Sequence, residues 1–313
     1  MPFRITDIVC YKVSMYPPQA KRCLALFLTM LLLAAPAWPA AQSKISAPMA
    51  PEMRSRLDSA NKGDAKTQNA LGEIYAQGRG VKKDPAQAAY WFRKAAEQNY
   101  TKAQYNLGQL YYAGDDFLRN YQEAVYWFNK AANLGNVEAQ NALGMCYEEG
   151  SGVEQDYTSA AKWYKLAANQ GHTSAQANFA YLVENGLGMP KDHETAFLFY
   201  QLSAIKGNPK GQYGLGNMYR NGQGVTADPT LAIRWYTKAA VQNYASAQYM
   251  LGVIYASDYD MDSDYVQAYM WWRIAERNGY KPAGENLIAI RQIMDSSQVE
   301  EAEKRAKRWK ARQ

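Results

Sequence analysis

The sequence repeats itself every 36 residues, and this period limits the chain to an array of similar structural units. Two columns of residues show the period most clearly, and no insertion interrupts either of them. The first column is Leu71, Leu107, Leu143, Phe179, Leu215 and Leu251. The second is Ala88, Ala124, Ala160, Ala196, Ala232 and Ala268. Units of one fixed length that carry apolar columns are expected to stack on one another.

Each unit has the pattern of two helices. The first half has small and apolar residues at helical spacing and ends at glycines such as Gly150 and Gly152, which break a helix. The second half follows an aspartate in N-cap position, such as Asp156, and ends at a glycine or asparagine that tolerates left-handed backbone. We therefore predict six helix–turn–helix units over residues 63–282, in which the recurring Ala, Leu, Tyr and Trp columns form the core.

The period continues beyond both ends of this array. Gly63 sits one period before Asn99, so residues 51–62 are predicted to form an N-terminal capping helix. Residues 283–313 are predicted to form C-terminal capping helices with a basic tail, and residues 42–50 a short linker. The basic helix of that tail contains Trp309 and suggests a weak contact with a membrane or an envelope polymer, with a solvated closing face as the alternative.

The first 41 residues have the features of a secretory signal peptide. Lys21 and Arg22 precede an apolar run over residues 23–35, and small residues follow it. Met15 is an alternative start, which would make residues 1–14 an over-called beginning. The run is shorter than the roughly 20 residues that span a bilayer, although an uncleaved anchor is the alternative. We expect a periplasmic or secreted protein.

Charge and composition exclude several classes of function. The net charge of +6 is concentrated in residues 1–40 and 301–313, so the nearly neutral body gives little attraction to nucleic acid. With only two histidines and three cysteines, the chain is a poor candidate for a structural zinc cluster or for histidine catalysis. Cleavage of the signal peptide would leave Cys146 alone, so no internal disulfide is expected. We predict no cofactor and no metal.

Two short motifs could indicate chemistry. Ser159-x-x-Lys162 and Ser203-x-x-Lys206 match a serine–lysine pair, but the chain lacks the companion Ser-Asp-Asn and Lys-Thr-Gly elements. The loop 258–264 alternates acidic residues as a calcium loop does, but it lacks the glycine and the final glutamate of such a loop. We therefore predict a chain that is not an enzyme.

The repeated motif resembles the Sel-one-like repeat, a relative of the tetratricopeptide repeat. The unit that shows it most fully contains Leu143-Gly144, Tyr147, Gly150, Gly152-Val153, Asp156, Ala160, Trp163-Tyr164 and Ala167-Ala168. The resemblance covers residues 63–294 and implies an all-α fold, a right-handed α-solenoid of helix–turn–helix repeats. It also implies a scaffold or adaptor in protein complexes, and bacterial members are often exported. Beta-lactamase activity has been claimed for some relatives, which carry a cysteine pair in each repeat that is missing here.

Some positions of the first helices vary from unit to unit on one face. Residues spaced i, i+4 and i+7 share a helix face, and in related solenoids the first helices line the concave side. We predict that this face forms a groove for a protein or peptide partner, although these residues could instead be solvated or packed between helices. The predicted groove residues are Asn69, Glu73, Tyr105, Gln109, Tyr112, Asn141, Met145, Glu148, Tyr181, Glu184, Tyr213, Asn217, Arg220 and Tyr249.

The sequence as a whole predicts an exported, monomeric scaffold that binds a protein or peptide. The alternative function is an enzyme, or a modulator of an enzyme, in cell-wall metabolism.

Overall fold

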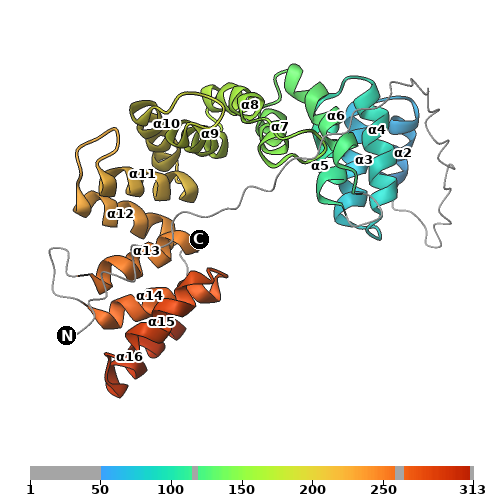
Figure 1. Cartoon of the computed structure of the whole chain (residues 1–313). Helices are drawn as coiled ribbons and strands as arrows, with labels where there is room; N and C mark the ends of the chain where they lie inside the picture. Colours follow the sequence, from blue (N-terminus) through green and yellow to red (C-terminus); the bar gives the residue numbers. More distant parts are fainter. Residues whose placement is uncertain (1–50, 115–118, 258–263, 311–313) are drawn as a thin grey trace, which may run out of the picture. The chain divides into compact units, whose positions relative to one another are not determined.

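The structure, a computed structural model, describes residues 51–114, 119–257 and 264–310. The predicted signal peptide, the linker and most of the acidic loop 258–264 lie outside these residues. The described residues contain only helices as regular structure, in the order α2 to α16 (Figure 1). The first ones are α2 (Pro51–Asn61), α3 (Ala65–Gln77), α4 (Pro85–Glu97), α5 (Thr101–Ala113), α6 (Tyr121–Asn133), α7 (Val137–Glu149) and α8 (Tyr157–Asn169). The others are α9 (Thr173–Asn185), α10 (His193–Ile205), α11 (Pro209–Asn221), α12 (Pro229–Ala240), α13 (Ala245–Ala256), α14 (Tyr265–Arg277), α15 (Pro282–Ile290) and α16 (Ser296–Arg308).

Consecutive helices pack against one another from α2 to α15, both within a unit and across the boundary to the next unit. The helix α16 instead packs on α14. This succession of helix–turn–helix units confirms the predicted all-α repeat architecture. Within the described part of the chain, no helix is both long and apolar enough to cross a bilayer.

The helices begin and end at residues that sequence reasoning can identify. An aspartate side chain accepts a backbone N–H at the start of five second helices, at Asp84, Asp156, Asp192, Asp228 and Asp264. Each of these caps satisfies an N–H that the first turn leaves unpaired. After each second helix the chain adopts positive φ, at Asn99, Gly135, Gly171, Gly207, Asn243 and Gly279.

Glycine allows the two helices of a unit to approach closely. A Cβ atom on Gly144 of α7 would lie 2.6 Å from the ring of Tyr164 in α8, closer than packed atoms can come. The fourth unit has Ala180 at the equivalent position, and there the ring of Tyr200 lies against α11 of the next unit. A Cβ on Gly214 of α11 would be 2.3 Å from that ring. The methyl group that Ala180 adds in the fourth unit is thus compensated by the absence of a side chain at Gly214 in the fifth.

A buried glutamine joins each unit to the helix before it. In every first helix its Nε2 donates to a backbone carbonyl near the end of the preceding helix, at distances from 2.9 to 3.3 Å. The pairs are Gln68 with Ala60, Gln104 with Ala96, Gln140 with Ala132, Gln176 with Ala168, Gln212 with Ala204, and Gln248 with Ala240. These bonds fix the spacing of neighbouring units.

In four units a second side chain satisfies the oxygen of this glutamine. An amide at the C-cap of the second helix, or one residue after it in the case of Gln242, donates to Oε1. The pairs are Gln98–Gln68, Gln170–Gln140, Gln242–Gln212 and Asn278–Gln248. The other two units carry Leu134 and Lys206 at this C-cap. In those two units the buried Oε1 atoms of Gln104 and Gln176 have no hydrogen-bond partner.

The substitution Leu134→Gln should stabilise the protein. Leu134 is 56% exposed, and a glutamine there would reach Gln104 Oε1 as Gln98 reaches Gln68. A hydrogen bond to a buried unsatisfied acceptor contributes about 0.5–1.5 kcal/mol, so the free energy of unfolding in urea should rise by about that amount. Leu134→Met, which has no amide, is the matched control and should change stability little. An equal effect of both substitutions would contradict this account of the junction.

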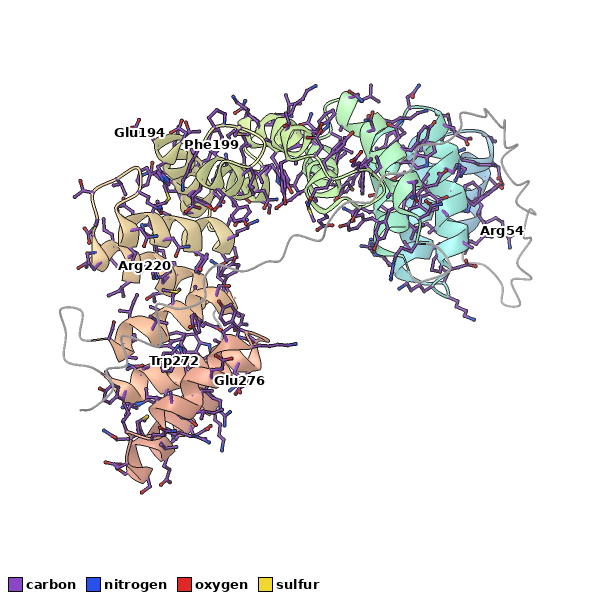
Figure 2. The ribbon with its side chains drawn as sticks, viewed as in Figure 1. Arg54, Glu194, Phe199, Arg220, Trp272 and Glu276 are labelled. Carbon is purple, nitrogen blue, oxygen red and sulfur yellow. The ribbon has the colours of Figure 1, made fainter. Side chains whose placement is uncertain are left out.

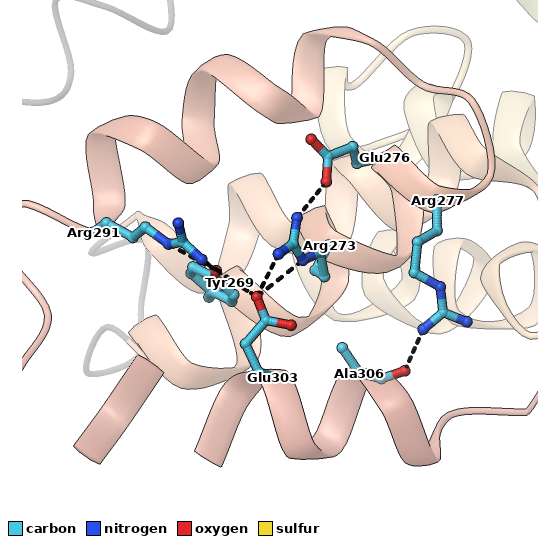
Figure 3. A network of polar contacts seen from close by, with 7 residues as sticks. All are labelled: Tyr269, Arg273, Glu276, Arg277, Arg291, Glu303 and Ala306. Carbon is cyan, nitrogen blue, oxygen red and sulfur yellow. Dashed lines mark hydrogen bonds and ion pairs between the residues drawn. The ribbon is translucent and has the colours of Figure 1, made fainter. Parts of the chain in front are cut away.

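The C-terminal helix is held on α14 by one carboxylate (Figure 3). Glu303 of α16 accepts hydrogen bonds from Tyr269 at 2.8 Å and from Arg273 at 2.6 Å, and it pairs with Arg291 at 3.3 Å. Partial burial raises the pKa of Glu303, but the bonds from Arg273 and Tyr269 outweigh it and leave the pKa below its ordinary value. The ring of Trp309 lies 4.8 Å from that of Trp271, so Trp309 packs against α14.

Candidate functional site

The fourteen predicted groove residues all lie on the first helices, and we call them the first-helix face. Their exposure differs. Asn69 is 3% exposed and is not open to a partner, whereas Tyr181 is 40% exposed and Arg220, in the last turn of α11, is exposed (Figure 2). The other eleven are half-buried. The face therefore consists of a few open side chains on a half-buried base.

At the α3–α5 end, polar side chains of the face are bonded to one another. Asn69 Nδ2 donates to Glu73 Oε1 at 2.9 Å, and Asn106 donates to Asn69 Oδ1 at 2.9 Å. Lys102 pairs with Glu73 at 2.8 Å. Partial burial raises the pKa of Glu73, but the hydrogen bonds from Lys102 and Asn69 outweigh this effect and leave the pKa below its ordinary value. The carboxylate is therefore ionised and paired.

A second polar chain connects α7, α9 and α11. Asn178 donates to Asn141 Oδ1 at 3.3 Å, and Lys210 Nζ donates to Asn178 Oδ1 at 2.6 Å. The same ammonium lies 5.5 Å from the centre of the Tyr181 ring. Burial lowers the pKa of Lys210. Lys210 thus contacts the ring of Tyr181, the most exposed tyrosine of the face, and connects it to the polar chain.

Sequence reasoning missed the lysines and asparagines of these two networks. Lys102 and Lys210 occupy the same position in different units, as do Asn106 and Asn178. A comparison of the units at every position of the first helix, rather than at three of them, would have found this signal.

The tyrosines of the face pack against second-helix aromatics with one side of the ring. Tyr105 lies 6.0 Å from Phe128, and its hydroxyl accepts from Gln109 at 2.8 Å. Tyr213 lies 5.8 Å from Tyr236. Such rings are held in place and still present a polar group, which is a useful combination for recognition.

Two glutamates of the face are tied to tyrosines of the second helix. Glu148 accepts from the hydroxyl of buried Tyr164 at 2.6 Å. The same pair recurs one unit later as Glu184 and Tyr200, at 2.8 Å. The first unit has no buried hydroxyl at this place and needs no acceptor, because Phe92 replaces the tyrosine and Ala76 replaces the glutamate. In the fifth unit Arg220 takes the place of the glutamate, and the hydroxyl of Tyr236 donates to Asn217 Oδ1 at 2.7 Å instead. A buried tyrosine of the second helix is therefore paired with an acceptor on the first helix.

A double-mutant cycle tests this pairing. Glu148→Ala should lower the free energy of unfolding by about 1–3 kcal/mol, because it leaves the hydroxyl of Tyr164 without its acceptor. Adding Tyr164→Phe should recover most of the loss, because the pair then matches Ala76 and Phe92. Urea unfolding of the two single variants and the double variant measures the coupling. Strictly additive effects would rule out the pairing.

One cavity of about 580 Å³ opens between α3, α4 and α5. Glu73 and Gln109 of the first-helix face line it, together with Asn106, and Phe92 and Leu110 supply an apolar wall. This combination suits an apolar side chain that is flanked by amide or hydroxyl groups.

The residues considered for chemistry have structural roles. Ser159 Oγ donates to the capping carboxylate of Asp156 at 2.6 Å, and buried Ser203 donates to the carbonyl of Thr173 at 2.8 Å. His172 is half-buried and caps α9, its Nδ1 accepting from Ala175 N–H at 3.1 Å, and burial lowers its pKa. Among the described residues, no group of His, Cys, Asp and Glu could hold a metal ion.

Comparison with protein families identifies six consecutive Sel1 repeats. They match residues 65–100, 101–136, 137–172, 173–208, 209–244 and 245–280. A comparison with curated proteins found no match.

Among solved structures, the chain is similar to a Sel1 repeat protein from Oxalobacter formigenes. The two share 32% sequence identity with a TM-score of 0.65, over 72% of this chain and 88% of that one. It also matches c5321, a protective antigen of uropathogenic Escherichia coli strains with an SLR fold. That match has 29% identity and a TM-score of 0.48, over 82% of this chain and 64% of that one.

Proposed function

Because the chain belongs to the Sel1 repeat family, whose members are generally protein-interaction scaffolds, we propose that it holds a peptide or protein partner along the first-helix face. The observation that carries this proposal is the composition of the face. Exposed Tyr181 and Arg220 stand among half-buried tyrosines and amides. Tyrosine and arginine are enriched among the residues that contribute most to binding at protein interfaces.

The base of the face supports an extended partner. Its polar networks and packed rings hold the side chains before binding, so little conformational entropy is lost when a partner arrives. The cavity beside Glu73 and Gln109 would accept one apolar side chain of that partner. Successive units present equivalent positions, so a partner that spans several units gains a small contribution from each.

We further propose that the protein acts as a monomer outside the cytoplasm. The basic and apolar pattern before residue 41 supports export. Cys146 is compatible with an oxidising compartment, because burial raises the pKa of its thiol to about 12 and keeps it protonated. Recovery of the mature chain from the periplasm or the medium, with a new N-terminus near residue 41, is the check of this proposal.

Affinity capture from the envelope fraction tests the first-helix face. Tyr181→Ala combined with Gln109→Ala should reduce recovery of the specific partner at least tenfold, because both side chains are part of the proposed contact. Tyr126→Ala is the matched control, since Tyr126 is 50% exposed and lies on α6, a second helix. Equal recovery with all variants, or loss only with Tyr126→Ala, would rule out the proposed face.

A further inference from the structure

The second helices carry an exposed row of side chains that is separate from the first-helix face. In three units one position of this row, that of Lys94, Lys130 and Lys238, holds a lysine whose ammonium lies over an aromatic ring of the same helix. The pairs are Lys94 with Tyr90 at 4.7 Å, Lys130 with Tyr126 at 4.9 Å, and Lys238 with Trp235 at 4.2 Å. The ammonium is attracted to the face of the ring, so the lysine covers part of an exposed aromatic side chain.

The helix α10 departs from this pattern. It carries Leu202 at the lysine position, and Leu198 and Ile205 lie on the same face at spacing i, i+4 and i+7. These three side chains are 39%, 50% and 68% exposed, respectively. Leu166, at the lysine position of α8, is 41% exposed. We call Leu198, Leu202 and Ile205 the α10 patch. Contiguous exposed apolar residues on a soluble protein commonly mark a contact surface.

The equivalent row in the sixth unit is apolar too, and there it is covered. Met270 and Ile274 of α14 correspond to Leu198 and Leu202, but they are only 8% and 1% exposed. The helix α16 lies on them, and Arg277 donates to the carbonyl of Ala306 at 2.8 Å (Figure 3). This chain therefore already contains one example of what covers such a row, namely an amphipathic helix.

The covering helix has a recognisable pattern. Ala302 and Ala306 of α16 and Trp309, the C-cap that follows it, are spaced i, i+4 and i+7. All three belong to or contact the apolar clusters that include α14. Glu303 beside this stripe pairs with Arg273 of α14 and with Arg291. The apolar row of α14, with arginines beside it, thus binds a helix that carries an apolar stripe flanked by a carboxylate.

We propose that the α10 patch is a docking site for an amphipathic helix of a partner protein, with apolar residues at i, i+4 and i+7 and carboxylates beside them. Phe199 of α10 occupies the position of Trp271, against which Trp309 packs (Figure 2 labels Phe199). Lys206, the exposed C-cap of α10, follows Ile205 directly, and its ammonium donates to the carbonyl of Gly171 at 3.1 Å. This ammonium and the exposed Lys162 and Lys165 of the preceding second helix would attract the carboxylates. This inference does not depend on the first-helix face.

The test uses the segment that already covers the equivalent row. A fluorescent peptide of residues 295–310 is titrated against the intact chain, whose own α16 occupies α14. We expect saturable binding with slower hydrogen exchange in α10. Leu202→Lys should raise the dissociation constant at least tenfold, and it should fold because three units carry lysine at this position. Ile288→Lys, at a site in α15 that is 69% exposed, is the matched control and should leave binding unchanged.

Three results would overturn the proposal. One is the absence of saturable binding with all variants folded by circular dichroism. Another is binding that is the same with Leu202→Lys, or that slows exchange only in α14. The third comes from sedimentation of the chain without peptide. Self-association that Leu202→Lys abolishes would assign the patch to a contact between copies of this chain instead.

Discussion

The spacing of the units depends on a side-chain hydrogen bond that recurs at every junction. A buried glutamine reaches from the first helix of each unit to a backbone carbonyl of the helix before it, from Gln68 with Ala60 to Gln248 with Ala240. Because the glutamine side chain has one length and the carbonyl lies near the end of a helix, the bond tolerates little change in the turn between them. A buried amide that loses this partner costs about 1–3 kcal/mol. This constraint explains why the turn between units keeps one length, with the glutamine always eight residues after its acceptor.

Within this fixed spacing, the units vary through coupled substitutions. The fourth unit shows this best, because Ala180 at the close-approach position is matched by Gly214 in the following helix. Likewise Ser203 stands where other units have alanine, and Gly211 leaves the room that its side chain needs, since a Cβ there would lie 2.3 Å from the Ser203 Oγ. The core of a repeat array can thus change in one unit as long as the neighbouring unit compensates.

The architecture could be predicted from the sequence because its signals are local and repeated. Aspartate caps, positive-φ residues and apolar columns each act within one helix or turn, so they can be read without coordinates. The candidate site was less predictable. Asn69 is buried and Tyr181 is exposed because the neighbouring units pack differently against their first helices. Such tertiary contacts cannot be predicted from local sequence signals. The glutamine recurs in every unit of the sequence, but its role could not be predicted, because a recurring polar residue does not reveal its acceptor.

Hydrogen exchange on a Gln140→Leu variant tests the central claim most directly. Gln140 donates to the Ala132 carbonyl and accepts from Gln170, so both of its polar atoms are used at the middle of the array. The account predicts a loss of about 1–3 kcal/mol in the free energy of unfolding. It also predicts that exchange becomes faster first at the end of α6 and the start of α7. Leucine has nearly the volume of glutamine and is apolar, so if packing alone set the spacing, the variant would be as stable as the natural chain and its exchange unchanged. That result would contradict the account.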